Sequence, residues 1–246
     1  MSEISYETAP FAVRADLTAA HARAWHRLAR PGAWFTGAER VAIAAEVRNA
    51  TACPLCRERK AALSPYAVDG EHQSLGVLGA PIVEVIHRVR TDPGRLTRRW
   101  FDSVRADGLS DGRYVEIIGV LANIVAMDTF ARGIGVDPWP LPEPVDGAPT
   151  NYRPVGAGPG PAWVPWIAPE DADDAEADLY EGTTGAHIRR ALSLVPDEVR
   201  GFFDLVETQY LPGAAMRDFD REFRAIDHAQ IELIAGRVSA LNGCVY

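Results

Sequence analysis

The segment from Glu39 to Cys56 reads ERVAIAAEVRNATACPLC and ends in two closely spaced cysteines. Apolar residues return at helical spacing at Ile43, Val47 and Ala50, which is typical of a helix that buries one face. Most other segments show the same spacing, whereas the alternating runs typical of strands are scarce. The sequence therefore predicts an all-α fold.

The expected helices and the long break between them divide the chain. The helices cover residues 17–28, 38–49, 54–63, 81–89, 93–106, 111–133, 187–194, 196–210 and 219–241. Between positions 138 and 169, ten of 32 residues are proline, and a helix cannot continue there because each proline removes a backbone donor. Three tryptophans in this segment should pack against the protein. We therefore expect a first helical unit over residues 1–137, a proline-rich and acidic strap over 138–186, and a second unit over 187–246.

Composition narrows the class of protein. Of 246 residues, 47% are hydrophobic and 24% are charged, and the net charge is −9. Such a charge disfavours binding to nucleic acid. The N-terminus lacks a basic region followed by an apolar run, and we find no stretch that approaches the length of a membrane span. We expect a cytoplasmic protein that binds neither nucleic acid nor membrane.

Cys53-Pro54-Leu55-Cys56 is the motif with the clearest chemistry. Pro54 suits the first position of a helix, which places Cys53 near the helix cap and Cys56 in the first turn. Free N–H groups and the helix dipole stabilise a thiolate there, as a redox pair requires. Structural zinc and inert thiols are the alternatives. Zinc usually takes four ligands, and no second Cys-x-x-Cys or close pair of histidines follows, so we expect neither a metal nor a cofactor.

An internal repeat connects this motif to the C-terminal end of the sequence. Residues 39–53 align without gaps with residues 230–244, and both segments end on a cysteine. The apolar stripe should bury one face of each helix, with Ile234 and Val238 in the places of Ile43 and Val47. The two helices are therefore expected to hold equivalent positions in two related helical units.

Residues 230–246, QIELIAGRVSALNGCVY, resemble the core motif of the alkylhydroperoxidase D-like (AhpD-like) proteins, in which a glutamate-bearing helix runs into Asn-Gly-Cys-x-x-Cys. The superfamily also includes carboxymuconolactone decarboxylases, and the resemblance covers about residues 20–144 and 196–246. It implies that Glu232 is the proton-relay glutamate and Cys244 a redox thiol. The first copy has Val41 where the second has Glu232, so Glu46 and Glu39 are the candidate substitutes there, in a different register.

The resemblance and the motif together imply a thiol-dependent peroxidase or disulfide oxidoreductase. A thiolate attacks the peroxide, becomes a sulfenic acid and is resolved to a disulfide by its neighbour. The partners implied are a peroxide or disulfide substrate, a thiol electron donor protein and further copies of the chain in a homo-oligomer. The candidate catalytic residues are Cys53, Cys56, Cys244, Glu232, Glu46 and His72.

Two other functions stay open, a decarboxylase of the same superfamily and a non-enzymatic helical scaffold with degenerate motifs. The second motif breaks off after Tyr246. We expect the natural chain to continue with a thiol or selenol that completes the second redox pair.

Overall fold

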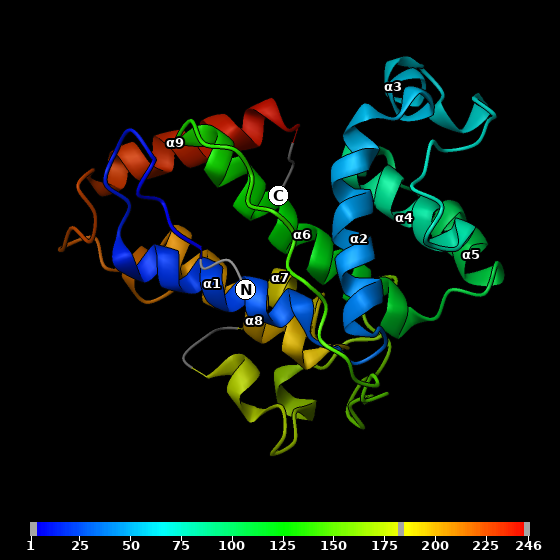
Figure 1. Cartoon of the computed structure of the whole chain (residues 1–246). Coiled ribbons are helices and arrows are strands. Elements are labelled where there is room, and N and C mark those ends of the chain that lie inside the picture. Colours follow the sequence, from blue (N-terminus) through cyan, green and yellow to red (C-terminus); the bar gives the residue numbers. More distant parts are fainter. Residues whose placement is uncertain (1–3, 182–184, 244–246) are drawn as a thin grey trace.

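A computed structural model describes residues 4–181 and 185–243, which form helices joined by loops (Figure 1). The α-helices are α1 (Ala15–Ala29), α2 (Gly37–Asn49), α3 (Pro54–Ala61), α4 (Ala80–Thr91), α5 (Arg98–Ala106), α6 (Asp111–Gly133), α7 (His187–Arg190), α8 (Pro196–Gln209) and α9 (His228–Leu241). Within the described ranges no β-strand forms, and strand-like pairing is limited to an isolated bridge between Gly158 and Trp166. The predicted all-α class is confirmed.

Two expected helices are shorter in the structure because capping residues set their starts. The segment 93–106 divides into a 3-10 turn and α5, since the Thr97 side chain accepts a hydrogen bond from the Trp100 N–H. The segment 219–241 becomes helical only at His228, where Asp227 and Gln230 form a capping box.

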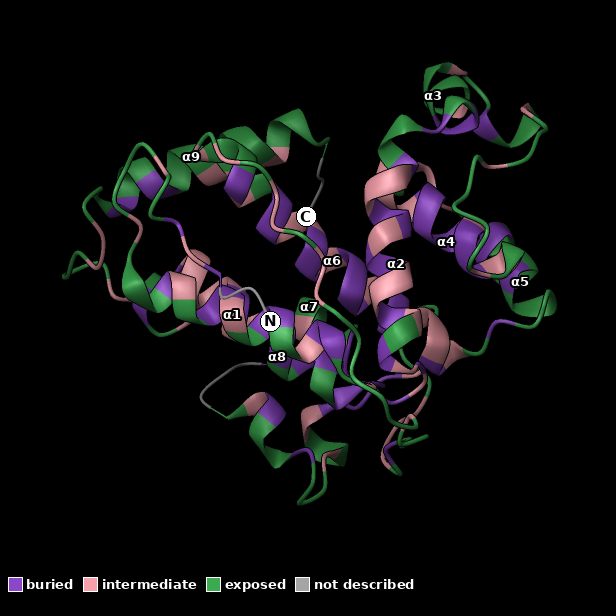
Figure 2. Cartoon of the chain, in the orientation of Figure 1, coloured by how far each residue is buried: buried purple, intermediate pink, exposed green. Residues whose placement is uncertain are grey.

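Helix α6 lies at the centre of the molecule and contacts α2, α4 and α8 (Figure 1). Helix α2 packs against both α6 and α4, which also contact each other, and α8 packs along α1. Figure 2 shows buried residues along α2, α4 and α6, whereas α9 is mainly exposed. Helices from both expected units thus contribute to one core, while the unit boundaries themselves stay a prediction.

Our expectation that no segment reaches membrane-spanning length is wrong for α6. This helix has 23 residues and a mean hydropathy of 1.5 over its most apolar window, so by length and composition alone it could cross a membrane. The same window is 61% buried inside the protein. A helix surrounded by other helices needs an apolar surface on several sides, and its place in the core accounts for its composition.

A buried charge cluster joins the three central helices. Arg40 of α2 donates through Nη1 to Glu116 of α6 and, at 2.7 Å, to Glu198 of α8. All three side chains are at most 3% exposed. Burial raises the pKa of Glu116 to about 7, against the opposing effect of Arg40. The cluster fixes the position of α2, whose C-terminal end leads to Cys53.

The proline-rich segment lies on the protein, as expected of a strap. Trp25 donates through Nε1 to the carbonyl of Pro140, and the Val145 N–H donates to the carbonyl of Ala29. Trp166 is buried, and Trp163 is 38% exposed. Hydrogen bonds from the strap to α1 replace those that a helix would have formed internally.

Helices α2 and α9 start alike but differ in packing. Both begin with a capping box. In α2 the predicted stripe is buried, whereas Ile234 and Val238 in α9 are 55% and 50% exposed. The expectation of a buried stripe is thus wrong for α9, because its buried residues are instead His228 and Ile231 in its first turn. Cys244 lies outside the described residues, so the equivalence of the two cysteines stays a prediction.

Candidate functional site

The Cys-x-x-Cys motif lies at the N-terminus of α3, as the sequence predicts. Cys53 is the N-cap residue, Pro54 is the first helical residue, and Cys56 follows in the first turn. Both thiols are free, and the two residues are only 1% and 3% exposed. The arrangement follows from local sequence, because proline suits the first helical position and its ring fixes φ.

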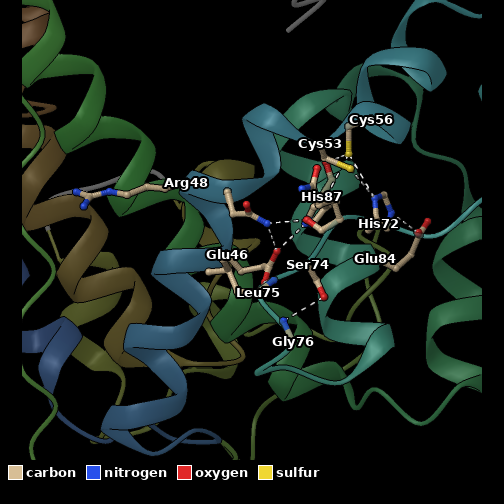
Figure 3. Close-up of polar contacts among 12 residues, drawn as sticks. Glu46, Arg48, Cys53, Cys56, His72, Ser74, Leu75, Gly76, Glu84 and His87 are labelled. Atoms are coloured by element: carbon tan, nitrogen blue, oxygen red, sulfur yellow. Dashed lines mark hydrogen bonds and ion pairs between the residues drawn. The ribbon is translucent and has the colours of Figure 1, made fainter.

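Two imidazoles contact these sulfurs (Figure 3). The Nδ1 atom of His72 lies 3.7 Å from Cys53 Sγ and 3.4 Å from Cys56 Sγ. The Nδ1 atom of His87 lies 3.3 Å from Cys56 Sγ. His72 comes from residues 62–79, which connect α3 to α4, and His87 from α4 itself. The four sulfur and nitrogen atoms all lie within 4.8 Å of one another.

A carboxylate lies at the far side of each imidazole. Glu84 Oε2 is 2.8 Å from His72 Nε2, and Glu46 Oε1 is 2.8 Å from His87 Nε2. A carboxylate accepts hydrogen bonds, so Nε2 of each ring carries a proton, and Nδ1 faces the sulfurs. Figure 3 shows the two carboxylates approaching from different sides, Glu46 from α2 and Glu84 from α4.

Both carboxylates are themselves held in place. The Trp100 indole N–H donates to Glu84 at 2.9 Å. Glu46 accepts from the Asn49 side chain at 2.8 Å and from the Leu75 N–H at 3.0 Å. These contacts fix the orientation of the rings through their carboxylates.

The polar contacts favour charged thiolates. Burial by itself raises the pKa of Cys56, but hydrogen bonds from His72 and His87 outweigh it and lower the pKa to about 6. Burial lowers the pKa of His72, and the contacts with Cys56 and Glu84 reverse this and raise it. The pKa of Glu84 falls to about 2, because its bonds to His72 and Trp100 outweigh its burial. Thiolate and imidazolium therefore stabilise each other here.

The structure brings together four of the predicted residues, namely Cys53, Cys56, Glu46 and His72. It also corrects our expectation that no pair of histidines accompanies the cysteines, since His72 and His87 both reach Cys56. His87 and Glu84 were not among the residues predicted from the sequence. The available signal was their i, i+3 spacing on one helix, which places them on the same face.

The remaining predicted residues lie elsewhere. Glu232 is exposed on α9 and accepts a hydrogen bond of 2.9 Å from the Tyr210 hydroxyl. Helix α9 lies well apart from α3 (Figure 1). Cys244 is outside the described residues, so its place relative to Glu232 stays a prediction.

Two kinds of chemistry fit the four side chains at the start of α3. Two adjacent thiols with imidazoles as proton donors can undergo oxidation to a disulfide, and the same four donor atoms could hold a metal ion. Comparisons with protein families, with curated proteins and with solved structures find no match for this chain.

Proposed function

We propose that the protein is a thiol oxidoreductase that uses Cys53 and Cys56 to reduce a peroxide or a disulfide. The observation that carries the proposal is the contact of Cys56 Sγ with two imidazoles, each supported by a carboxylate. The resemblance to AhpD-like proteins supports the same chemistry.

In this proposal Cys56 is the attacking thiol, because Cys56 contacts both imidazoles whereas Cys53 contacts only His72. The Cys56 thiolate attacks a peroxide oxygen, the O–O bond breaks, and the leaving alkoxide takes a proton from an imidazolium. Cys56 becomes a sulfenic acid and the product is an alcohol. The peroxide is reduced by two electrons and the sulfur is oxidised by two.

Cys53 then resolves the sulfenic acid. Its thiolate attacks Cys56 Sγ, the S–O bond breaks, and the hydroxide leaves as water after taking a second proton. The product is a disulfide between neighbouring residues of one helix end, which an external thiol donor reduces by exchange.

Access to the sulfurs depends on the segment that carries His72. Both cysteines are buried, whereas most of residues 62–79 are exposed. A substrate reaches Cys56 when this segment moves away from α3, because the sulfurs are otherwise enclosed. Such a segment, with few buried apolar contacts, is the part of a protein that opens most easily.

The test uses metal-free, reduced protein treated with hydrogen peroxide, followed by thiol counting and mass spectrometry. We expect an intramolecular disulfide between Cys53 and Cys56, no reaction of the pair in Cys56→Ser, and a sulfenic acid trapped on Cys56 in Cys53→Ser. Cys244→Ser is the matched control and should keep the disulfide. A rate for native protein no faster than that of the urea-unfolded chain would overturn the proposal.

A further inference from the structure

We propose that Cys53, Cys56, His72 and His87 bind one Zn²⁺ ion, and that zinc binding and oxidation of the thiol pair exclude each other. Zinc binding stands on the geometry of these four side chains. The mutual exclusion also rests on the proposed function. Zinc was one of the alternatives left open by the motif, and the structure supplies the two ligands that the sequence did not reveal.

The donor atoms already have the spacing of a tetrahedral site. With Zn–S near 2.3 Å and Zn–N near 2.0–2.1 Å, a sulfur and a nitrogen on one tetrahedron are about 3.6 Å apart. The three contacts between sulfur and Nδ1 measure 3.3, 3.4 and 3.7 Å. All four atoms lie within 4.8 Å of one another, so shifts of about 1 Å or less complete the tetrahedron.

The donor types select the metal. Two thiolates and two imidazoles form an S₂N₂ set, which suits zinc and disfavours magnesium and calcium, since these prefer oxygen ligands. Two thiolates and one Zn²⁺ also cancel in charge when both imidazoles are neutral. A neutral centre is what an enclosed site with cysteines only 1% and 3% exposed favours.

The carboxylates behind the histidines distinguish a metal site from a simple thiol–imidazole pair. A histidine that binds a metal usually donates its other N–H to a carboxylate or carbonyl, which fixes the tautomer and the ring orientation. Here both rings do so, each at 2.8 Å, to Glu84 and Glu46. A single histidine backed by a carboxylate is enough to activate a thiol. Two such histidines beside the same pair of sulfurs complete a set of four metal ligands.

The site also lies where the fold needs a cross-link. Cys53, Leu55 and Cys56 form a small buried hydrophobic cluster of their own, and among the described residues Val68 is the partly buried hydrophobic residue that packs against it. This cluster is separate from the main core. A metal held by α3, by the segment 62–79 and by α4 ties this corner together, as structural zinc does in small domains.

In a site with four protein ligands each thiolate shares a lone pair with the metal, so zinc lowers the nucleophilicity of both sulfurs toward a peroxide. Formation of the disulfide removes both thiolate ligands, so oxidation releases the metal. Two zinc-bound thiolates, one hydroperoxide and two protons give one disulfide, one alcohol, one water and one free Zn²⁺ ion. The hydroperoxide is the oxidant and gains the two electrons that the sulfurs lose.

The first experiment measures metal binding to the full-length, reduced chain. Titration with Zn²⁺ should end at one ion per chain, and Co²⁺ in its place should give the intense visible absorption of a tetrahedral site and a sulfur-to-metal charge-transfer band. His72→Ala and His87→Ala should each abolish the tetrahedral spectrum. His26→Ala, which changes an exposed histidine of α1, is the matched control and should bind as the native chain does.

Variants of the supporting carboxylates guard against misfolding of the ligand variants. Glu46→Gln and Glu84→Gln keep all four ligands and should lower zinc affinity by about 10 to 100-fold, with helical content confirmed by circular dichroism. Absence of stoichiometric binding, an octahedral cobalt spectrum, or binding that survives both histidine substitutions would overturn the zinc site.

The second experiment separates this inference from the proposed function. Peroxide added to zinc-loaded protein should release one Zn²⁺ for each disulfide formed, and more slowly than metal-free protein is oxidised. Disulfide formation with zinc retained would overturn mutual exclusion. If the thiols bind zinc but peroxide does not oxidise them even in metal-free protein, the redox function is refuted and the metal site stands. If peroxide oxidises the thiols but they do not bind zinc, the metal site alone is refuted.

Discussion

Replacing Arg40 by methionine is expected to destabilise the scaffold that carries the site. Methionine keeps an unbranched, mostly apolar stem but is shorter than arginine and removes the positive charge between Glu116 and Glu198. The two carboxylates are 0% and 2% exposed and belong to α6 and α8. The substitution therefore leaves two buried negative charges without their shared partner.

The expected cost follows from that burial. Breaking a buried ion pair by removing one partner typically costs about 3–5 kcal/mol, because the charge left behind is not compensated. The positive charge of Arg27 also interacts with Glu198, which places the estimate near the lower end, at roughly 3 kcal/mol. For a chain of this size such a loss lowers Tm by about 6–12 °C.

The assay is urea unfolding of the native protein and Arg40→Met, followed by circular dichroism at pH 5 and pH 8. The loss should be smaller at pH 5, because burial raises the pKa of Glu116 to about 7 and this carboxyl is then protonated, which removes one of the unpaired charges. Arg23→Met is the matched control. Its partner Asp204 is 36% exposed, so the cost should stay within about 1 kcal/mol. Equal losses in both variants, or a loss in Arg40→Met that does not change with pH, would refute the reasoning.

Three further predictions address other parts of the molecule. Glu116 has a folded pKa of about 7 against an ordinary 4.5, so its contribution to stability is complete below pH 4.5 and is lost as the pH rises through 7. Glu116→Gln should therefore flatten the fall in the free energy of unfolding between pH 5 and pH 8. An unchanged slope in this variant would contradict the raised pKa. Ile43→Ala should lower the free energy of unfolding by about 2–5 kcal/mol, because Ile43 is fully buried. Ile234→Ala should lower it by under about 1 kcal/mol. Similar losses for the two variants in urea unfolding would contradict the exposure of α9. Zinc at 100-fold over its Kd should raise the free energy of unfolding by about 2.7 kcal/mol and slow hydrogen exchange mainly in α3 and residues 62–79. Removal of the metal by a chelator should reverse both effects. Protection from exchange spread evenly over the chain would contradict the assigned position of the metal.

Features that depend on neighbouring residues could be predicted from the sequence. Helix α6 has the predicted bounds, because its apolar composition and the capping residue Ser110 lie within one segment. The placement of Cys53 at a cap follows in the same way from Pro54. The strap follows from its prolines, which prevent helix over a long stretch whatever surrounds them.

Features that depend on packing could not be predicted from the sequence. His87 meets Glu46 across 41 positions of sequence, and only the packing of α2 against α4 brings the two side chains together. Likewise, α2 and α9 share an apolar pattern and a capping box, yet the stripe is buried only in α2, which packs against α1, α4 and α6. A local pattern states which face of a helix can be buried, but the neighbouring helices determine whether that face is buried and which polar groups meet beside it.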